Sequence, residues 1–216
     1  MKAVLFDLDG TLIQSIPDIA RCMNRALAMH GLPGHDEAAY CYMLGNGARM
    51  LARRAVGEAH AALLDAVLGD YRALYSKHCY DTSHLYADVP EMLRGLRAEG
   101  LRLTVLSNKD DGDVASVIGH YFDPSPFEII RGRLPGVPLK PDPAAALGIA
   151  RELGVAPEDF WYLGDTATDL ETAKAAGMRF IAAGWGFRTP KELREAGADC
   201  IAASPSEAGR MMLKDD

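Results

Sequence analysis

Short apolar runs alternate with helix-like stretches along most of this 216-residue chain, and this alternation restricts its fold more than any other feature. We expect strands at 3–8, 102–106, 160–163, 179–183 and, as a weaker candidate, 199–202. We expect helices between them at 89–98, 143–153 and 168–176, each with a glycine at or just past its end. Strands that alternate with helices form a parallel sheet covered by helices. The sequence therefore predicts an α/β fold.

The alternation is interrupted between residues 14 and 81, where no convincing strand occurs and helical periodicity takes over. We expect helices there at 16–30, 37–43, 48–56 and within 59–80. In the last of these, apolar side chains recur at three- and four-residue spacing, which is typical of one buried helix face. We therefore predict a parallel-sheet core formed by residues 1–13 and 82–216, with a small all-α insert formed by residues 14–81.

The charge balance and the cysteines restrict the compartment and the partners. A formal net charge of −7 argues against non-specific binding to nucleic acid or to an anionic membrane. The four cysteines have no metal-type spacing, so we expect reduced thiols in the cytoplasm. Asp7 interrupts the N-terminal apolar run, which excludes a secretory signal, and no apolar run approaches a membrane span. The sequence does not indicate an oligomeric state.

The first apolar run ends in two carboxylates, Asp7 and Asp9, followed by a glycine turn. The carboxyl end of a parallel strand is where open α/β sheets bind their ligands. Side chains two residues apart on an extended segment share a face, so one carboxylate can attack a substrate while the other moves protons. The alternative is that Asp9 is only a turn residue, because Asp-Gly is a common turn signal.

A second cluster follows the run at 102–106, where Ser107 and Asn108 come directly after the last apolar residue. A hydroxyl at the carboxyl end of a strand can hold a phosphate oxygen, and adjacent backbone N–H groups can help. The signal is weak by itself, because Ser-Asn is also an ordinary loop start.

A third cluster centres on Lys140, which precedes Pro141-Asp142-Pro143. The prolines restrict the backbone, so Lys140 approaches the next helix on a constrained segment. The alternative is that Lys140 is a solvated surface charge and Asp142 only a helix cap.

A fourth cluster contains Asp165 and Asp169, which follow the apolar run at 160–163. Asp169 can be a first-turn helix acid favoured by the helix dipole, whereas Asp165 has no such simple explanation. Gathered at one rim with Asp7 and Asp9, these acids would repel one another unless a cation joined them. Oxygen ligands without His or Cys favour a hard cation such as Mg²⁺. Together with a lysine for an anionic group, this set predicts a phosphoryl-transfer site.

In their order and spacing, the four clusters resemble the four motifs of the haloacid dehalogenase superfamily of phosphohydrolases. The matching residues are Asp7-Leu8-Asp9-Gly10-Thr11-Leu12, Ser107-Asn108, Lys140 and Gly164-Asp165-Thr166-Ala167-Thr168-Asp169. The resemblance implies a Rossmann-like core with the insert of residues 14–81 as a helical cap. Within the superfamily the chain is similar to phosphoglycolate phosphatase-like enzymes, in Gly45-Asn46-Gly47, Lys140-Pro141-Asp142-Pro143 and Gly184-Trp185-Gly186. Asp9 argues against a haloalkanoic acid dehalogenase, because those relatives carry no acid there.

The resemblance also implies a role for each matching residue. Asp7 attacks phosphorus and forms an aspartyl-phosphate, while Asp9 protonates the leaving group and then deprotonates the water that hydrolyses this intermediate. The residues expected to bind substrate phosphate are Thr11, Ser107, the adjacent Asn108 and Lys140. Mg²⁺ is expected on the side chains of Asp7 and Asp165 and on the backbone carbonyl of Asp9, and Asp169 is expected to orient a metal-bound water.

The predicted substrate is a small phosphorylated metabolite, with 2-phosphoglycolate as the best single candidate. Arg49, on the expected helix at 48–56, can reach the carboxylate of such a substrate, because Arg suits that geometry. Arginines at the spacing of Arg49, Arg53 and Arg54 also commonly form the solvated face of a helix. Two alternatives to a phosphatase remain, a sugar phosphomutase and a non-catalytic binding or regulatory module. The intact set of acids and lysine disfavours the second.

Overall fold

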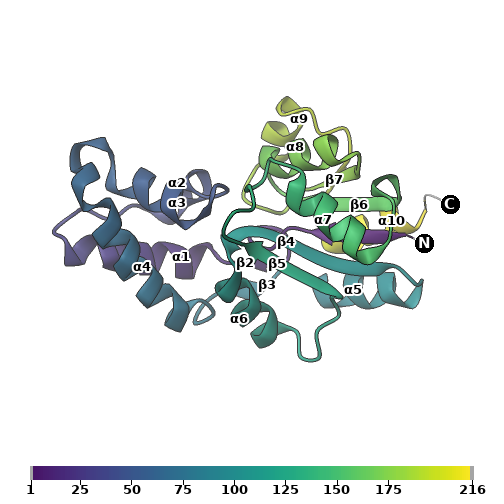
Figure 1. Cartoon of the computed structure of the whole chain (residues 1–216), viewed down its shortest axis with the longest axis horizontal. Helices are drawn as coiled ribbons and strands as arrows, with labels where there is room; N and C mark the ends of the chain where they lie inside the picture. Colours follow the sequence, from purple (N-terminus) through teal and green to yellow (C-terminus); the bar gives the residue numbers. More distant parts are fainter. Residues whose placement is uncertain (1, 215–216) are drawn as a thin grey trace.

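A six-stranded sheet forms the centre of the structure, a computed structural model that describes residues 2–214. Its strand order is β5-β4-β1-β6-β7-β8, and all neighbouring strands run parallel (Figure 1). The strands are β1 (Ala3–Phe6), β4 (Arg102–Asp110), β5 (Ile129–Arg133), β6 (Phe160–Gly164), β7 (Arg179–Ala183) and β8 (Ile201–Ala202). The predicted α/β fold with a parallel sheet is therefore confirmed. Because β1 lies between β4 and β6, the chain changes direction across the sheet there, and ligands bind at such switch points.

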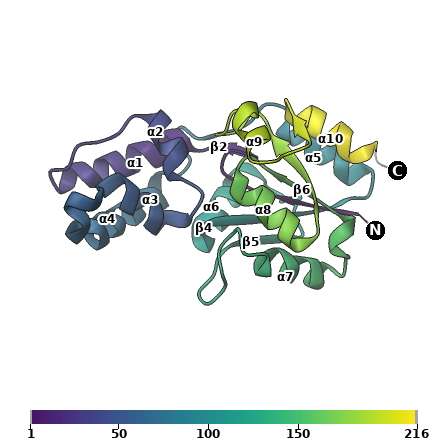
Figure 2. The same cartoon turned by 90° about the horizontal axis from the view of Figure 1, so that it is seen from above.

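Helices cover both faces of this sheet. They are α5 (Val89–Ala98), α6 (Asp111–Tyr121), α7 (Ala144–Leu153), α8 (Ala167–Ala176), α9 (Pro190–Glu195) and α10 (Pro205–Leu213). Figure 2 shows α5 and α10 on the opposite side of the sheet from α7. In β1, Val4 and Phe6 pack in the core that contains α5 and α10, while Ala3 and Leu5 pack in the core that contains α7 and α8. The buried strand thus supplies both cores, as alternating side chains of one strand must.

A helical insert, which we define as α1 to α4, extends to one side of the sheet (Figures 1 and 2). It contains α1 (Ile16–Met29), α2 (Glu37–Met43), α3 (Gly47–Val56), the 3₁₀ helix η1 (Glu58–Leu63) and α4 (Leu64–His78). The chain enters through β2 (Ile13–Gln14) and returns through β3 (His84–Leu85), which pair antiparallel. Between residues 2 and 214, no helix combines the length and the apolar character that crossing a membrane requires.

Asp18 joins the two connections between the insert and the core. Its carboxylate is fully buried in the first turn of α1 and accepts hydrogen bonds from Thr82 Oγ1 at 2.6 Å and from the backbone N–H of Ser83 at 2.8 Å. Burial by itself would raise the pKa of Asp18, but these donors outweigh it and lower the pKa to about 2. The outgoing and returning segments are therefore bound to one charged side chain.

Several elements differ from the sequence-based expectations. The long helix within 59–80 begins only at Leu64, because the preceding six residues form η1. The weak strand at 199–202 shortens to β8. The strand at 102–106 continues to Asp110, although its pairing with β5 is irregular after Leu106. The elements not predicted are β2, β3, β5, α6, α9, α10 and the 3₁₀ helix η2 (Pro157–Asp159).

Candidate active site

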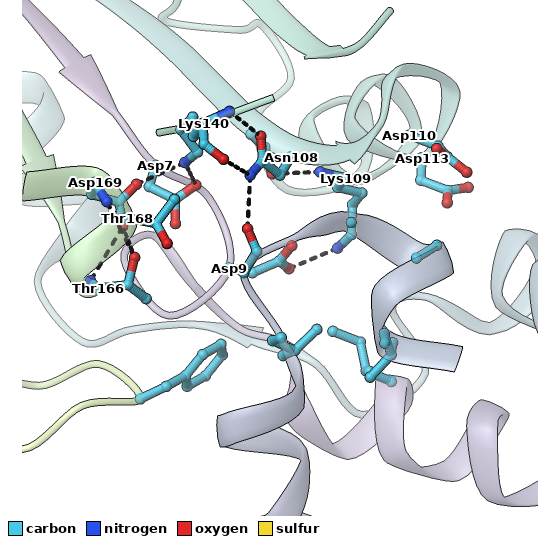
Figure 3. Close-up of a pocket in the computed structure, with 18 of the residues that line it drawn as sticks. Asp7, Asp9, Asn108, Lys109, Asp110, Asp113, Lys140, Thr166, Thr168 and Asp169 are labelled. Carbon is cyan, nitrogen blue, oxygen red and sulfur yellow. Dashed lines mark hydrogen bonds and ion pairs between the residues drawn. The ribbon is translucent and has the colours of Figure 1, made fainter. Parts of the chain in front are cut away.

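The carboxyl ends of β1, β4 and β6 meet at a cavity of about 70 Å³ between the sheet and the helical insert. Asp7 and Asp9 follow β1, and Lys140 lies on the loop before α7 (Figure 3). The remaining core residues in its wall include Ser107, Asn108, Lys109, Thr166 and Asp169. The insert supplies the opposite, more apolar wall with Ile19, Cys41, Leu44, Leu51 and Tyr71. The cavity therefore gathers residues of all four sequence clusters under the insert.

Lys140 joins two acids in the centre of the site. Its Nζ lies 2.7 Å from Asp7 Oδ1 and 2.7 Å from Asp169 Oδ1, and it also donates to the backbone oxygen of Leu106 at 3.2 Å. Burial raises the pKa of Asp7 to about 7, with a further increase from Asp169 and an opposing decrease from Lys140. Burial would lower the pKa of Lys140, but Asp169 and Asp7 reverse this and hold it well above its usual value.

Three buried acids form a group that can hold a metal ion. Carboxylate oxygens of Asp7, Asp165 and Asp169 lie within 4.8 Å of one another. Burial, followed by repulsion from Asp7 and Asp169, raises the pKa of Asp165 well above its usual value. Three close carboxylates with one lysine leave an excess of negative charge that a cation would balance. The donor set contains only oxygen, which fits a hard divalent cation.

Glycines allow the chain to close tightly around these acids. A Cβ on Gly10 or on Gly186 would lie 2.3 Å from an atom of Asp165, and a Cβ on Gly164 would lie 2.4 Å from Asp169. Any side chain at these positions would therefore displace an acid. The glycines next to both acidic clusters are visible in the sequence, but only the fold shows that Gly186 meets Asp165.

Asp169 belongs to this group of three acids and also lies in the first turn of α8. The backbone N–H of Asp169 donates to Thr166 Oγ1 at 3.3 Å and the backbone N–H of Thr166 donates to Asp169 Oδ2 at 3.2 Å, which forms a capping box at the start of α8. Thr166 Oγ1 also donates to Asp169 Oδ2 at 2.6 Å. Asp169 Oδ1 accepts from Lys140, and from Tyr162 at 3.2 Å. The expected place of Asp169 in the first turn of a helix is confirmed, whereas its role beside a metal ion stays a prediction. The Thr166-to-Asp169 spacing was the available signal for the cap.

The carboxylate of Asp9 points toward Lys109 and away from Asp7 and Asp169 (Figure 3). Asp9 Oδ1 lies 2.6 Å from Lys109 Nζ, which also lies 2.7 Å from the hydroxyl of Tyr75 in α4. Burial by itself would lower the pKa of Lys109, but Asp9 outweighs it and raises this pKa. Neither Lys109 nor Tyr75 was predicted as a site residue, since both need tertiary structure to reach Asp9.

The expected phosphate-binding residues occupy different positions. Ser107 and Asn108 lie where the register between β4 and β5 shifts, and such irregularities redirect side chains. Both line the cavity. Thr11 is fully buried outside the lining, and its hydroxyl donates to Asp165 Oδ1 at 3.3 Å. In this structure Thr11 therefore supports a candidate metal ligand.

Arg49 does not line this cavity. Its Nη1 pairs with Asp65 Oδ1 at 2.5 Å, and the two side chains are 60% and 79% exposed. Arg53 pairs with Glu58 on the same exposed surface. In this structure α3 directs the Arg49 side chain to solvent, as the alternative interpretation of the arginine spacing indicated, and a contact of Arg49 with substrate stays a prediction.

A family model described as haloacid dehalogenase-like hydrolase matches residues 4–183. The chain belongs to this family. It is 35% identical to a phosphoglycolate phosphatase of Pseudomonas putida over 86% of this chain and 70% of the relative. A phosphoglycolate phosphatase of Yersinia pseudotuberculosis is 33% identical over 94% of this chain and 89% of the relative. The predicted superfamily and the predicted hydrolase are therefore confirmed.

Solved structures with the same fold support this assignment. A predicted phosphoglycolate phosphatase from Haemophilus somnus superposes with a TM-score of 0.90 at 27% identity, covering 98% of this chain and 97% of that one. CbbY from Rhodobacter sphaeroides, solved in complex with phosphate, superposes with a TM-score of 0.76 at 25% identity, covering 97% and 98%. Both alignments include the helical insert as well as the sheet, since they span nearly the whole chain.

Proposed function

We propose that this hydrolase is a Mg²⁺-dependent phosphatase that hydrolyses 2-phosphoglycolate or a closely related small phosphate ester. The observation that carries the proposal is the contact of Asp7 with Lys140 beside the acids Asp165 and Asp169. This arrangement offers a nucleophile, a cation for the phosphoryl oxygens and a place for a divalent metal ion. Relatives at 33% to 35% identity bear the name phosphoglycolate phosphatase, which supports the choice of substrate.

In the proposed reaction, Asp7 acts as the nucleophile. One of its carboxylate oxygens bonds to phosphorus while the bond from phosphorus to the leaving alcohol breaks, giving an aspartyl-phosphate. Lys140, 2.7 Å from Asp7, favours the ionised carboxylate and faces the negative phosphoryl oxygens. Ser107 and Asn108, which line the same cavity, are placed to hold those oxygens.

Asp9 moves the protons of both half-reactions. Its carboxyl group gives a proton to the departing alcohol oxygen, and the resulting carboxylate then takes a proton from the water that attacks phosphorus. Attack by this water breaks the bond between phosphorus and Asp7, so inorganic phosphate leaves and the enzyme is restored.

The side chains of Asp7 and Asp165 and the backbone carbonyl of Asp9 would hold the Mg²⁺, with Asp169 beside them. The ion would neutralise charge on the phosphoryl oxygens and reduce the repulsion between the acids. We also propose that the helical insert, joined to the core by residues 14 and 82, acts as a cap that excludes water from the closed cavity.

The deciding experiment is a screen of phosphate release from phosphorylated metabolites, with 2-phosphoglycolate included, in EDTA and in excess Mg²⁺. We expect 2-phosphoglycolate to give the highest kcat/KM and EDTA to abolish turnover. Full activity in EDTA would overturn the metal assignment. Transfer of the phosphoryl group to a bound sugar without release of phosphate would identify a phosphomutase instead.

A further inference from the structure

Lys109 is the second lysine in the cavity wall, and the chemistry proposed above gives it no task. Its side chain is only 8% exposed, so a charged ammonium group has been taken out of water at this point. Such burial is costly unless the ammonium is paired and hydrogen-bonded. The groups that pair with the Lys109 ammonium therefore indicate the role of its positive charge.

Those partners come from the two sides of the cavity. Lys109 Nζ donates to Asp9 Oδ1 at 2.6 Å on the core side and to the Tyr75 hydroxyl at 2.7 Å on the side of the helical insert. The ammonium also lies 4.9 Å from the centre of the Tyr75 ring, within the range of a cation–π contact. Tyr75 thus holds Lys109 by its oxygen and by its ring.

Tyr75 is itself rigidly placed. It is 1% exposed, and its ring stacks on that of Tyr71 one helical turn earlier in α4, with 5.4 Å between ring centres and 24° between planes. A buried, stacked ring has little freedom to rotate. It therefore gives Lys109 a fixed anchor, and through Lys109 it fixes the carboxylate of Asp9.

The contact leaves one Asp9 oxygen available. Lys109 takes Oδ1, and in the part of the chain that the structure describes no side chain or backbone group hydrogen-bonds to Oδ2. The Asp9 side chain is 16% exposed, toward the cavity. Proton transfer requires a heavy-atom separation of about 2.6–3.2 Å, so a carboxyl group that rotated freely would be poorly suited to it.

We propose that Lys109 and Tyr75 are positioning residues that hold Asp9 for proton transfer at its Oδ2. The inference rests on the proposed function, in which Asp9 protonates the leaving alcohol. When the bond from phosphorus to the alcohol breaks, the proton moves from Asp9 Oδ2 to the alcohol oxygen, and the new carboxylate is paired with the Lys109 ammonium. Lys109 keeps its own protons throughout, and the attacking water later returns a proton to Asp9.

The test compares leaving groups that differ in their need for a proton. The alcohol part of an alkyl phosphate such as 2-phosphoglycolate departs as a basic alkoxide unless it is protonated, whereas 4-nitrophenyl phosphate releases a stable phenolate. Phosphoenzyme formation is measured for both in rapid-quench single turnovers, with Lys109→Met and Tyr75→Phe. Tyr86→Phe is the matched control, because the Tyr86 hydroxyl is buried with no hydrogen-bond partner among the described residues.

We expect Lys109→Met to slow phosphoenzyme formation from the alkyl phosphate by at least about tenfold, part of the 10²–10⁴-fold that acid–base assistance supplies. The rate with 4-nitrophenyl phosphate should stay within about twofold of wild type, because that step needs no acid. Tyr75→Phe should show the same selectivity with a smaller loss, and Tyr86→Phe should match wild type. Tyr75→Phe keeps both charges and nearly the same volume, so it tests the inference even where Lys109→Met does not fold.

Equal losses for both substrates would overturn the inference, because they would indicate general damage to the site. An increase in KM with unchanged kcat would also overturn it, since Lys109 would then bind substrate instead of positioning Asp9. Asp9→Asn in the same assay separates the two proposals. If Asp9→Asn slows both substrates equally, the assignment of Asp9 as the acid is wrong. If Asp9→Asn slows the alkyl phosphate selectively but Lys109→Met and Tyr75→Phe do not, only the positioning inference fails.

Discussion

Asn108 Nδ2 donates to the backbone oxygen of Gly45 at 2.7 Å, which joins the end of β4 to the loop between α2 and α3. The same amide donates to the backbone oxygen of Lys140 at 3.0 Å and accepts from its N–H at 2.9 Å. One buried side chain therefore fixes the backbone of the lysine that contacts Asp7 and binds the helical insert to the core.

Asn108→Ala should affect stability and activity together. Removing the amide leaves the buried N–H and C=O of Lys140 without this partner, so we expect a loss of about 1–3 kcal/mol in the free energy of unfolding. The kcat should fall as well, because the Lys140 backbone is no longer held. Urea unfolding and steady-state kinetics measure the two effects, and an unchanged unfolding free energy would contradict the described hydrogen bonds.

Asp7→Asn should abolish phosphate release without unfolding the protein. The amide cannot act as the nucleophile, and it removes one charge from a group of three close acids. We therefore expect a melting temperature in EDTA that is equal to or higher than that of wild type. Glu171→Gln, which neutralises an exposed acid on α8, is the control and should retain turnover. Phosphate release near the wild-type rate in Asp7→Asn would refute the mechanism.

In EDTA, stability should fall as the pH rises from about 4 to about 7. The pKa of Asp7 is about 7 in the folded protein against 3.8 for the free side chain, so the folded state binds more protons than the unfolded state between these values. Unfolding is then favoured by raising the pH through this window. Melting curves in EDTA and in Mg²⁺ test this, with Mg²⁺ expected to remove the decline. A flat profile in EDTA would show that burial does not raise the pKa of Asp7 in the folded protein.

Arg49→Ala should leave kcat/KM for 2-phosphoglycolate within about twofold of wild type, because an exposed ion pair contributes little and Arg49 does not reach the cavity. The comparison is with an aryl phosphate that carries no carboxylate. A selective loss of about tenfold or more for 2-phosphoglycolate, the cost of one charged hydrogen bond, would mean that α3 turns Arg49 inward during turnover.

The sequence predicted the site better where the signal was local. Asp7, Asp9 and Asp165 are each adjacent to an apolar strand. The carboxyl ends of neighbouring parallel strands lie at the same edge of the sheet, independently of the loop conformations. Lys109 and Tyr75 are separated by 34 residues and meet only through the packing of α4 on the core, so no local pattern could pair them. For Arg49 the sequence left two interpretations open, because helical spacing does not say which face of a helix points to a cavity.

The strands of the sheet were also predicted better where the sequence signal is local. The buried strand β1 reads as a continuous apolar run, which parallel strands with helices on both faces require. The edge strand β5 contains Arg131 and Gly132 and pairs on one side only, so its sequence lacks that run. Gly132 is needed there for a different reason, since a Cβ would lie 2.5 Å from the backbone of Asp111 at the start of α6.

The hydrogen bonds that join both connections at Asp18 have a consequence for which changes of sequence this chain can tolerate. Because Ile13 pairs with Leu85, the polypeptide leaves the sheet and comes back to it at one place. A segment with adjoining ends can be lengthened, shortened or exchanged without moving the strands on either side of it. The strand-end acids and the helical insert are thus encoded by parts of the gene that can vary separately, provided that a carboxylate remains at position 18 to receive the returning chain.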